Sequence, residues 1–392
     1  IIFFWVARMV FSGLEYTGKL PFKDVLMHGI VRDSQGRKMS KSLGNGIDPL
    51  MVIDKYGADA LRFTLVTGNA PGNDMRYYDE KVEASRNFAN KIWNATRFVL
   101  MNQKEELPEE LSAQELTAAD RWILSKVNTL AKEVTESLVK YDLGIAADAL
   151  EHFFWEEFCD WYIEMVKARL YKEPCADRTA AMWTLVTVLA NALKLLHPYM
   201  PFITEELYSY IRPQEETIMY AAWPKYREDW SFPQETEEVE AMKEAIRGIR
   251  NIRTQMNVPP KQKSQVIFVS EDAATRRIFE NGAEFLVPLA FASEVKVQND
   301  MTGISETAVS IPLHLATAFI PLEQLVDLEK EKGRLQKEWD RLAKEIERTA
   351  KKLENPGFVS KAPQAVVEEE RKKKAKYEAM QRQVEEQLRR LG

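Results

Sequence analysis

The chain has 392 residues, more than a single domain usually holds, so we expect two to four domains. A formal net charge of −6 excludes a globally basic nucleic-acid-binding protein, so any polyanion would have to meet a local basic patch. The two cysteines, Cys159 and Cys175, form no CxxC or Cys/His cluster, which argues for a reducing compartment and against a structural zinc site.

The first segment is apolar and opens as "IIFFWVARMVF", without an initiator Met. Residues 1–17 predict an amphipathic helix that ends near Gly18. The run lacks the basic n-region of a signal peptide, and it is about half as long as the ~20 residues of a membrane span. We therefore expect the sequence to begin inside a domain, as the C-terminal portion of a longer protein.

A glycine-flanked loop follows the next apolar segment. Residues 24–33, "DVLMHGIVRD", predict a buried strand, and the loop "GRKMSKSLGNGIDPL" occupies residues 36–50. Residues 48–66 predict a helix with Asp48 as its N-cap and Pro49 at its first position. A helix, a strand, a glycine loop and a helix in this order are typical of the second half of a nucleotide-binding α/β sheet.

These patterns divide the chain into four predicted parts, and the fold class is multidomain and mostly α. Residues 1–70 are the remnant of a Rossmann-type α/β domain, and residues 71–235 have the dense apolar spacing of a helical bundle. Residues 236–320 combine short strand-like runs with two helices, at 237–256 and near 272–281, in a small α+β unit. Residues 321–392 carry two heptad arms around a Pro/Gly break, with Leu328, Lys332 and Leu335 in the first arm and Leu391 in the second. This pattern predicts an antiparallel coiled-coil hairpin, although heptad runs also serve dimerisation.

The predicted bundle begins with a long helix at residues 80–101, and an acidic, proline-containing linker follows at residues 103–114. Thr117 and Asp120 predict a capping box that opens the next helix, and dense apolar spacing predicts a further helix over residues 144–171. Four aromatic residues in this part of the chain are predicted to lie in the core, namely Trp93, Phe153, Trp155 and Trp161.

Two lysines three positions apart in the loop could meet one polyanion. Lys38 and Lys41 lie between Gly36 and Gly44, which would act as hinges. Such cations help most when they meet charge that develops on a departing pyrophosphate. A solvated surface turn would explain two lysines near a glycine equally well. The full pentapeptide KMSKS, followed by LGN and then a helix, is far more specific.

With this motif the chain resembles the class I aminoacyl-tRNA synthetases, whose second signature is KMSKS. The segments "IIFFWVARM", "YGADALRF", "FCDWYIEM" and "LLHPYMPFITEELY" and the terminal hairpin resemble the valine-specific members, over essentially the whole chain. The resemblance implies activation of valine with ATP and Mg²⁺, and transfer to tRNA(Val), by a monomeric cytoplasmic enzyme without structural zinc. The HIGH signature and the editing domain of the family are absent, so we expect this chain alone to be inactive in adenylation.

The resemblance also implies roles for individual residues. In the family the second lysine, here Lys41, binds ATP, and Lys38 orders the loop over pyrophosphate. The other residues that it places at the nucleotide are Ser40, Ser42, His28 and Gly29. Ile1 and Trp5 are four positions apart on one helical face, where they would form the apolar wall of the valine pocket or serve as core residues.

The bundle resembles the anticodon-binding domain of the family, which implies stacking surfaces and cations that face RNA. Lys81 and Phe98 match positions that meet anticodon bases, and Arg97 is a further candidate. Arg250 lies in the basic segment 247–263, which would contact a tRNA backbone or form a solvated face. The terminal hairpin, with "RKKKAK" in its second arm, would brace the tRNA.

Two other classes of function stay open at this point. In the first, the chain is a non-catalytic RNA-binding or assembly module, its lysine loop is vestigial, and its coiled coil recruits a partner. In the second, it belongs to a synthetase for isoleucine or leucine. The terminal hairpin and the lack of cysteine zinc ligands disfavour that second class.

Overall fold

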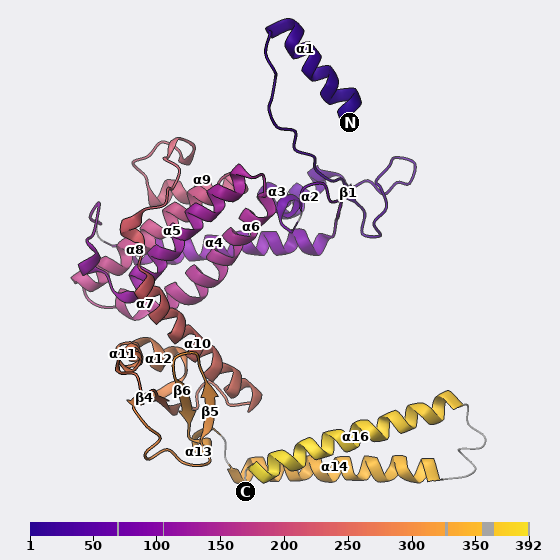
Figure 1. The fold of residues 1–392 in the computed structure, drawn as a ribbon, viewed down its shortest axis with the longest axis vertical. Helices are drawn as coiled ribbons and strands as arrows, with labels where there is room; N and C mark the ends of the chain where they lie inside the picture. The colour runs from indigo at the N-terminus through magenta and orange to yellow at the C-terminus, as the bar shows by residue number, and fades with distance from the viewer. Residues whose placement is uncertain (69, 105, 326–327, 355–363, 391–392) are drawn as a thin grey trace. The chain divides into compact units, whose positions relative to one another are not determined.

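The computed structural model describes residues 1–392 except 69, 105, 326–327, 355–363 and 391–392, and it omits the side chains of 328–332, 334–335, 364–366 and 386–390. The chain is mostly helical and divides into two compact units, Ile1–Thr236 and Glu237–Gly392 (Figure 1). Each unit is described by itself below.

The first unit opens with a helix, as predicted. A π-helical turn, η1 (Ile2–Val6), runs into α1 (Ala7–Thr17). The helix ends at Gly18, whose φ of 67° lies in the left-handed region that favours glycine at a helix C-terminus.

The prediction of a buried strand over residues 24–33 was wrong. Only β1 (Val31–Arg32) is a strand, and its apolar neighbours Val25, Leu26 and Met27 are exposed. Strands of a parallel sheet are buried when strands flank them and helices cover both faces. Within the described residues β1 pairs with one strand, the parallel β2 (Met75–Arg76), and otherwise only with the single bridge partner Lys38, so apolar content alone overestimated its burial.

The helix predicted over residues 48–66 is two helices, α2 (Pro49–Tyr56) and α3 (Ala58–Val66). Asp48 caps α2 by accepting a hydrogen bond from the Leu50 amide at 2.9 Å, which confirms the predicted start. The break falls at Gly57, whose φ is 93°. The two helices bury a small apolar cluster, which we call the loop-side core: Val52, Tyr56, Ala60, Leu61, Tyr77 and Val82.

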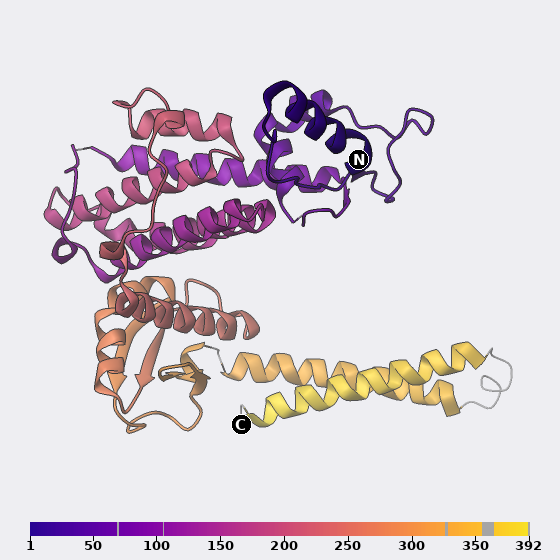
Figure 2. The same cartoon turned by 45° about the horizontal axis from the view of Figure 1, so that its top comes forward.

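Six helices and a π-helical segment form a bundle in the rest of the first unit (Figures 1 and 2). The predicted capping box is confirmed, because the Thr117 amide donates to the Asp120 carboxylate at 2.9 Å. The predicted helix over residues 144–171 is interrupted in the middle by π-helical geometry. The elements are α4 (Asp79–Asn102), α5 (Ala118–Val139), α6 (Leu143–His152), η3 (Phe153–Tyr162), α7 (Ile163–Leu170), α8 (Ala176–Leu196) and α9 (Pro201–Ile211).

Helix α8 is the central helix of this bundle. In the described part of the chain it is the one helix that is apolar and long enough to cross a membrane. However, 83% of its most apolar 18-residue stretch is buried inside the protein. The core helix of a bundle has the same length and composition, so the sequence of α8 is explained by packing.

Two polar residues join α3 to the turn between α8 and α9. Asp59 accepts hydrogen bonds from the amides of Phe202 and Ile203, at 3.3 and 2.7 Å, and so caps the start of α9. Arg62 donates to the carbonyl oxygens of Pro198 and Tyr199, at 3.1 and 3.3 Å. The helix pair that follows the lysine-containing loop is therefore held to the bundle at both ends of one turn.

The second unit contains a four-stranded sheet in the order β4-β3-β6-β5. β3 and β4 are parallel, and the other neighbours are antiparallel. The predicted strands and the helix near residues 272–281 are confirmed, whereas α12 was not predicted. The elements are α10 (Pro233–Gln255), β3 (Ser264–Val269), α11 (Ala273–Asn281), α12 (Ala283–Leu289), β4 (Ala292–Gln298), β5 (Val309–Pro312) and β6 (Thr317–Ile320).

After the short helix α13 (Leu322–Leu325), two long helices, α14 (Leu328–Glu354) and α16 (Gln364–Arg390), pack against each other. Leu342 and Val384 share a buried cluster, and the Lys352 ammonium lies 3.5 Å from the Glu370 carboxylate. Residue numbers rise in one helix as they fall in the other, so the pairing is antiparallel. The predicted Pro/Gly turn and the heptad side chains of Leu328, Lys332, Leu335 and Leu391 lie outside the described residues.

Candidate functional site

The lysine loop, which we define as residues 36–45, begins in a tight hairpin turn. The Asp33 amide donates to the Arg37 carbonyl at 3.0 Å, and the Gly36 amide donates to the Asp33 carbonyl at 2.8 Å. Gly36 has a φ of 80°, so the turn needs the left-handed conformation that glycine adopts easily. The chain reverses there, and Lys38 forms an antiparallel bridge with Arg32.

Asp33 is the polar centre of this hairpin. It is 7% exposed, and its carboxylate accepts hydrogen bonds from the Arg37 amide and the Arg37 Nε, both at 2.7 Å. It also accepts from the side-chain amide of Asn45, across the base of the loop, at 2.9 Å.

The hydrogen bonds to the Asp33 carboxylate lower its pKa from 3.8 to about 2, and the bond from Asn45 has the largest effect. The stabilisation from this ionised carboxylate is thus present above its unfolded pKa and is lost as the pH falls through about 2.

A second carboxylate fixes the strand on which the loop is mounted. Asp74 accepts a hydrogen bond from the Ile30 amide at 2.8 Å and pairs with the Arg32 guanidinium at 2.5 Å. The pKa of Asp74 is lowered, first by the Ile30 amide and then by the hydrogen bond from Arg32. Both carboxylates at the base of the loop are thus ionised and already paired.

The two lysines of the loop remain available. Lys38 and Lys41 are exposed, and in the part of the chain that the structure describes neither ammonium has an ion-pair or hydrogen-bond partner. The hydroxyls of Ser40 and Ser42 lie 3.2 Å apart, and the Leu43 amide donates to the Ser40 Oγ at 3.3 Å. The loop thus presents two cations to solvent while its hydroxyls stabilise its own turn. This arrangement suits a polyanionic ligand.

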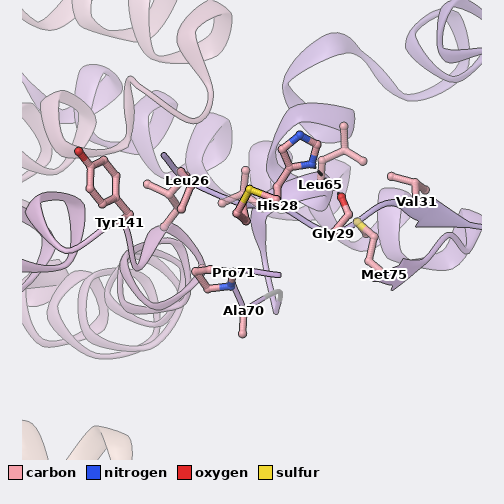
Figure 3. A pocket seen from close by; sticks show the side chains of 13 residues that line it. Leu26, His28, Gly29, Val31, Leu65, Ala70, Pro71, Met75 and Tyr141 are labelled. Atoms are coloured by element: carbon pink, nitrogen blue, oxygen red, sulfur yellow. Dashed lines mark hydrogen bonds between the residues drawn. The ribbon is translucent and has the colours of Figure 1, made fainter. Parts of the chain in front are cut away.

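His28 and Gly29, the other predicted nucleotide residues, line a cavity of about 310 Å³ (Figure 3). Its walls are chiefly apolar and include Leu65, Met75 and Tyr141. His28 is exposed, and its Nδ1 lies 2.8 Å from the Gly29 carbonyl oxygen. No described residue of the lysine loop lines this cavity, so the structure does not bring the lysines and these two residues into one pocket.

Gly29 has a structural reason to be glycine. A Cβ at this position would lie 1.8 Å from the Asn73 carbonyl oxygen and 2.7 Å from the Asp74 amide. The backbone of the 73–74 turn, which carries the carboxylate that pairs with Arg32, therefore approaches Gly29 closely.

Gly29→Ala should for this reason destabilise the first unit by roughly 1–3 kcal/mol or more, because backbone rather than a movable side chain must give way. Thermal and urea unfolding of the chain would measure the loss. The matched control is Gly46→Ala, since a Cβ there meets nothing within 4 Å. Equal unfolding midpoints for the two variants would contradict the close approach.

Ile1 and Trp5, predicted as the wall of a valine pocket or as core residues, are 69% and 58% exposed. The Arg8 guanidinium lies 5.6 Å from the centroid of the Trp5 ring. Since both side chains are open to solvent here, the structure does not bury them as core residues, and it leaves their predicted role at a substrate untested.

The predicted RNA-facing residues of α4 do not form one patch. Lys81 is exposed, with its ammonium 5.9 Å from the Tyr78 ring. Phe98, which is half-buried, follows 17 positions later, which is about 25 Å along a helix and roughly a quarter turn around it. Arg97 is exposed on nearly the opposite side of the helix from Lys81. A single nucleotide cannot contact all three side chains.

Two of the four aromatic residues predicted as core are correctly placed, and two are not. Phe153 and Trp161 are buried, whereas Trp93 and Trp155 are 43% and 37% exposed. Trp93 lies about 100° around α4 from the buried Ile92, at the edge of the buried stripe and about 20° beyond Val82. Trp155 lies under the Lys91 ammonium, which is 5.1 Å from its ring centroid.

Arg250, predicted as a tRNA contact, is engaged within the second unit. Its Nε donates to the Leu289 carbonyl at 2.8 Å, and its guanidinium lies 5.8 Å from the Phe291 ring centroid. Arg253 is buried and donates to the Ser264 hydroxyl at 3.3 Å. These two arginines support the fold, while Lys261 and Lys263 of the same basic segment are exposed.

The described residues contain no group of three or more His, Cys, Asp or Glu side chains placed to hold a metal ion. Cys159 is buried, and burial raises the pKa of its thiol to about 12, so the free thiol is protonated at neutral pH. Cys175 is exposed.

Three family descriptions match successive parts of the chain. Residues 1–78 match "tRNA synthetases class I (I, L, M and V)", and residues 120–268 match "Anticodon-binding domain of tRNA ligase". Residues 327–392 match "Valyl tRNA synthetase tRNA binding arm". The lysine loop falls within the first match, and the paired helices α14 and α16 fall within the third.

Individual relatives are similar in sequence along nearly the whole chain. The valine–tRNA ligase of Clostridium perfringens is 53% identical over 390 residues, which cover 99% of this chain and 44% of that protein. That of Carboxydothermus hydrogenoformans is 48% identical over 374 residues, covering 95% of this chain and 42% of that protein.

Among solved structures, the ternary complex of Agrobacterium radiobacter K84 LeuRS with tRNA and LeuAMS matches this chain at 19% identity and a TM-score of 0.47. The match covers 67% of this chain and 28% of the matched chain.

The chain spans less than half the length of the valine–tRNA ligases that it matches. About half of its residues are identical to theirs along nearly its whole length, and the three family matches follow in sequence order, so the chain belongs to the valine–tRNA ligase family of class I aminoacyl-tRNA synthetases.

Proposed function

We propose that the chain is the part of a valine–tRNA ligase that carries the pyrophosphate-binding loop and binds tRNA(Val). The observation that carries the proposal is the lysine loop, which presents two exposed ammonium groups in a chain about half identical to valine–tRNA ligases. The substrates are valine, ATP with Mg²⁺, and tRNA(Val), and the enzyme is a cytoplasmic monomer. Nothing in this assignment requires structural zinc.

Each predicted part of the chain has its own role in the proposal. Residues 1–70 complete the Rossmann-type catalytic domain, and residues 71–235 are the anticodon-binding bundle. Residues 236–320 are a small α+β domain that connects the bundle to residues 321–392, the coiled-coil arm that braces the tRNA.

In the proposed first step a carboxylate oxygen of valine attacks the α-phosphorus of ATP. The bond from this phosphorus to the bridging oxygen breaks, and pyrophosphate leaves with the electron pair. Negative charge therefore grows on the departing group, where Lys41 and Lys38 donate charge-assisted hydrogen bonds. Because neither ammonium forms an ion pair within the described part of the chain, neither has to leave a partner before it meets this charge.

In the second step the hydroxyl of the terminal ribose of tRNA attacks the valyl carbonyl carbon, and AMP leaves. The bundle and the arm bind other parts of the same tRNA. Phe98 would stack on one base while Lys81, about 25 Å away along α4, meets another part of the RNA. The exposed Lys261 and Lys263 would add salt-dependent contacts with phosphates.

The test of the proposal separates RNA binding from chemistry. The 392-residue chain should bind tRNA(Val), with an affinity that falls as salt is raised, and should not catalyse valine-dependent pyrophosphate exchange. Filter binding and an exchange assay would measure the two activities, with a tRNA of different anticodon as the control. Robust exchange by this chain, or equal affinity for both tRNAs, would contradict the assignment.

A further inference from the structure

The lysine loop is closed at its base by one pair of side chains, Asp33 and Asn45. The Asn45 Nδ2 donates to the Asp33 Oδ2 at 2.9 Å, across 12 positions of the chain. We call this pair the loop clip. Asp33 is held from its other side by the backbone amides of Gln35 and Arg37, at 3.1 and 2.7 Å, so its carboxylate cannot swing away from Asn45 without breaking the hairpin turn.

Asn45 also holds the backbone between the two lysines. Its Oδ1 accepts a hydrogen bond from the Ser40 amide at 2.9 Å, and its Nδ2 also donates to the Lys38 carbonyl at 3.3 Å. Between these two bonds, the partly buried Met39 packs against the loop-side core of α2 and α3. Three successive residues are thereby fixed by their backbone or by an apolar side chain, and none of these contacts uses an ammonium group.

The charge of the clip is balanced locally. Asp33 is paired with the Arg37 guanidinium at 2.7 Å, so its negative charge is already compensated and attracts the two lysines less. A clip built on an unpaired carboxylate would attract Lys38 or Lys41 and withdraw it from a ligand. The observed arrangement orders the loop and leaves both cations exposed.

Cations lower a barrier most when they already occupy the positions where charge will develop, because no reorganisation is then needed during the reaction. We propose that Asp33 and Asn45 are positioning residues that set Lys38 and Lys41 for the departing pyrophosphate. This inference rests on the proposed function, since it assigns to the clip the geometry of the same step. Neither residue touches the reacting atoms; both act through the loop.

The first arm of the test measures the loop itself in the present chain. Asn45→Asp keeps the shape of the side chain but sets two carboxylates against each other, so the Ser40 amide should exchange its hydrogen roughly tenfold faster or more. The double change Asp33→Asn with Asn45→Asp restores one donor and one acceptor across the base of the loop and should recover much of the protection. Gln35→Ala is the control, because it keeps the amide that donates to Asp33 and removes an exposed side chain that has no hydrogen bond or ion pair among the described residues.

The second arm measures catalysis in a full-length ligase that carries this chain. Asn45→Asp should lower kcat for valine-dependent pyrophosphate exchange by about 10–100-fold and change KM for ATP less than about threefold, because the clip acts on the transition state. The double change should return kcat to within about tenfold of the parent, and Gln35→Ala should leave it unchanged. Affinity for tRNA(Val) should be equal in all four proteins.

The outcomes separate the inference from the function on which it rests. If the parent ligase exchanges pyrophosphate but Asn45→Asp is as active as the parent, the positioning role is refuted and the proposed function stands. Unchanged protection of the Ser40 amide in Asn45→Asp also refutes it, because the clip would then not hold the loop. A parent ligase without valine-dependent exchange would refute the proposed function, and the positioning role with it.

Discussion

Replacing Lys41 by alanine in a full-length ligase that carries this chain should lower valine-dependent pyrophosphate exchange by roughly 10²–10³-fold, the usual cost of removing a donor aimed at developing charge. The Lys41 ammonium has no ion-pair partner among the described residues, so its loss leaves no buried charge and the fold should be intact. The fall should appear mainly in kcat, since the cation meets charge that is present only in the transition state.

Controls for this prediction come from the same region of the chain. Lys23→Ala removes another exposed cation that lies outside the loop, and it should leave exchange within about twofold of the parent. Binding of tRNA(Val) should be nearly the same for all three proteins, because the proposed RNA contacts lie elsewhere. An unchanged exchange rate in Lys41→Ala would remove the role assigned to this lysine, and a parallel loss in Lys23→Ala would point to a general charge effect.

The local signals in the sequence were reliable where one contact decides the geometry. The caps at Asp48 and at Thr117 with Asp120, and the helix end at Gly18, are set by hydrogen bonds within four residues, and all three were predicted. The strand over residues 24–33 failed for the opposite reason. An apolar run indicates that a segment is more stable when buried. Whether it is buried depends on the strands and helices that pack against it.

Interruptions within helices were also missed. Gly57 divides the helix predicted over residues 48–66, and the segment Phe153–Tyr162 is π-helical within a run that reads as one α-helix. A π-helical turn depends on packing against other elements, so the apolar period of its own residues does not reveal it. The exposure of Trp93 was not predictable from spacing alone, because Trp93 lies only about 20° around α4 from the buried Val82.

The KMSKS motif predicts Lys38 and Lys41 as site residues, and this stays a prediction. The side chains that order the loop were not predicted. Asp33 and Asn45 stabilise the loop through side-chain bonds to backbone and to each other, and such bonds leave no periodic pattern. One signal was present: an Asp three positions before a Gly is typical of a turn whose first residue caps its own backbone. Gly29 was assigned to the nucleotide, whereas the observed contact that requires glycine is with Asn73.

The largest expected effect on stability comes from a buried ion pair in the bundle. Arg169 and Asp120 are 2% and 0% exposed, and the guanidinium binds both carboxylate oxygens of Asp120, at 2.8 and 2.9 Å. Arg169 also donates from its Nε to Asp177 at 2.7 Å, and Tyr162 donates its hydroxyl to Asp120 at 2.6 Å. Burial alone would lower the pKa of Arg169, but the hydrogen bonds and charge of Asp120 outweigh it and raise the pKa, so the guanidinium stays charged.

Arg169→Ala should therefore cost about 3–5 kcal/mol of the free energy of unfolding of the first unit, because it leaves the Asp120 carboxylate buried without its cation. The double variant Asp120→Ala with Arg169→Ala should cost less than the sum of the single changes, since no charge is then stranded. Lys167→Ala is the control on the same helix: its exposed pair with Glu164 should contribute within about 0.5 kcal/mol. Urea unfolding followed by tryptophan fluorescence measures this unit selectively, because Trp339 is the one tryptophan of the nine beyond residue 236. Equal costs for Arg169→Ala and Lys167→Ala would mean that water reaches Asp120 and that the bundle core is more open than the packing around α7 and α8 indicates.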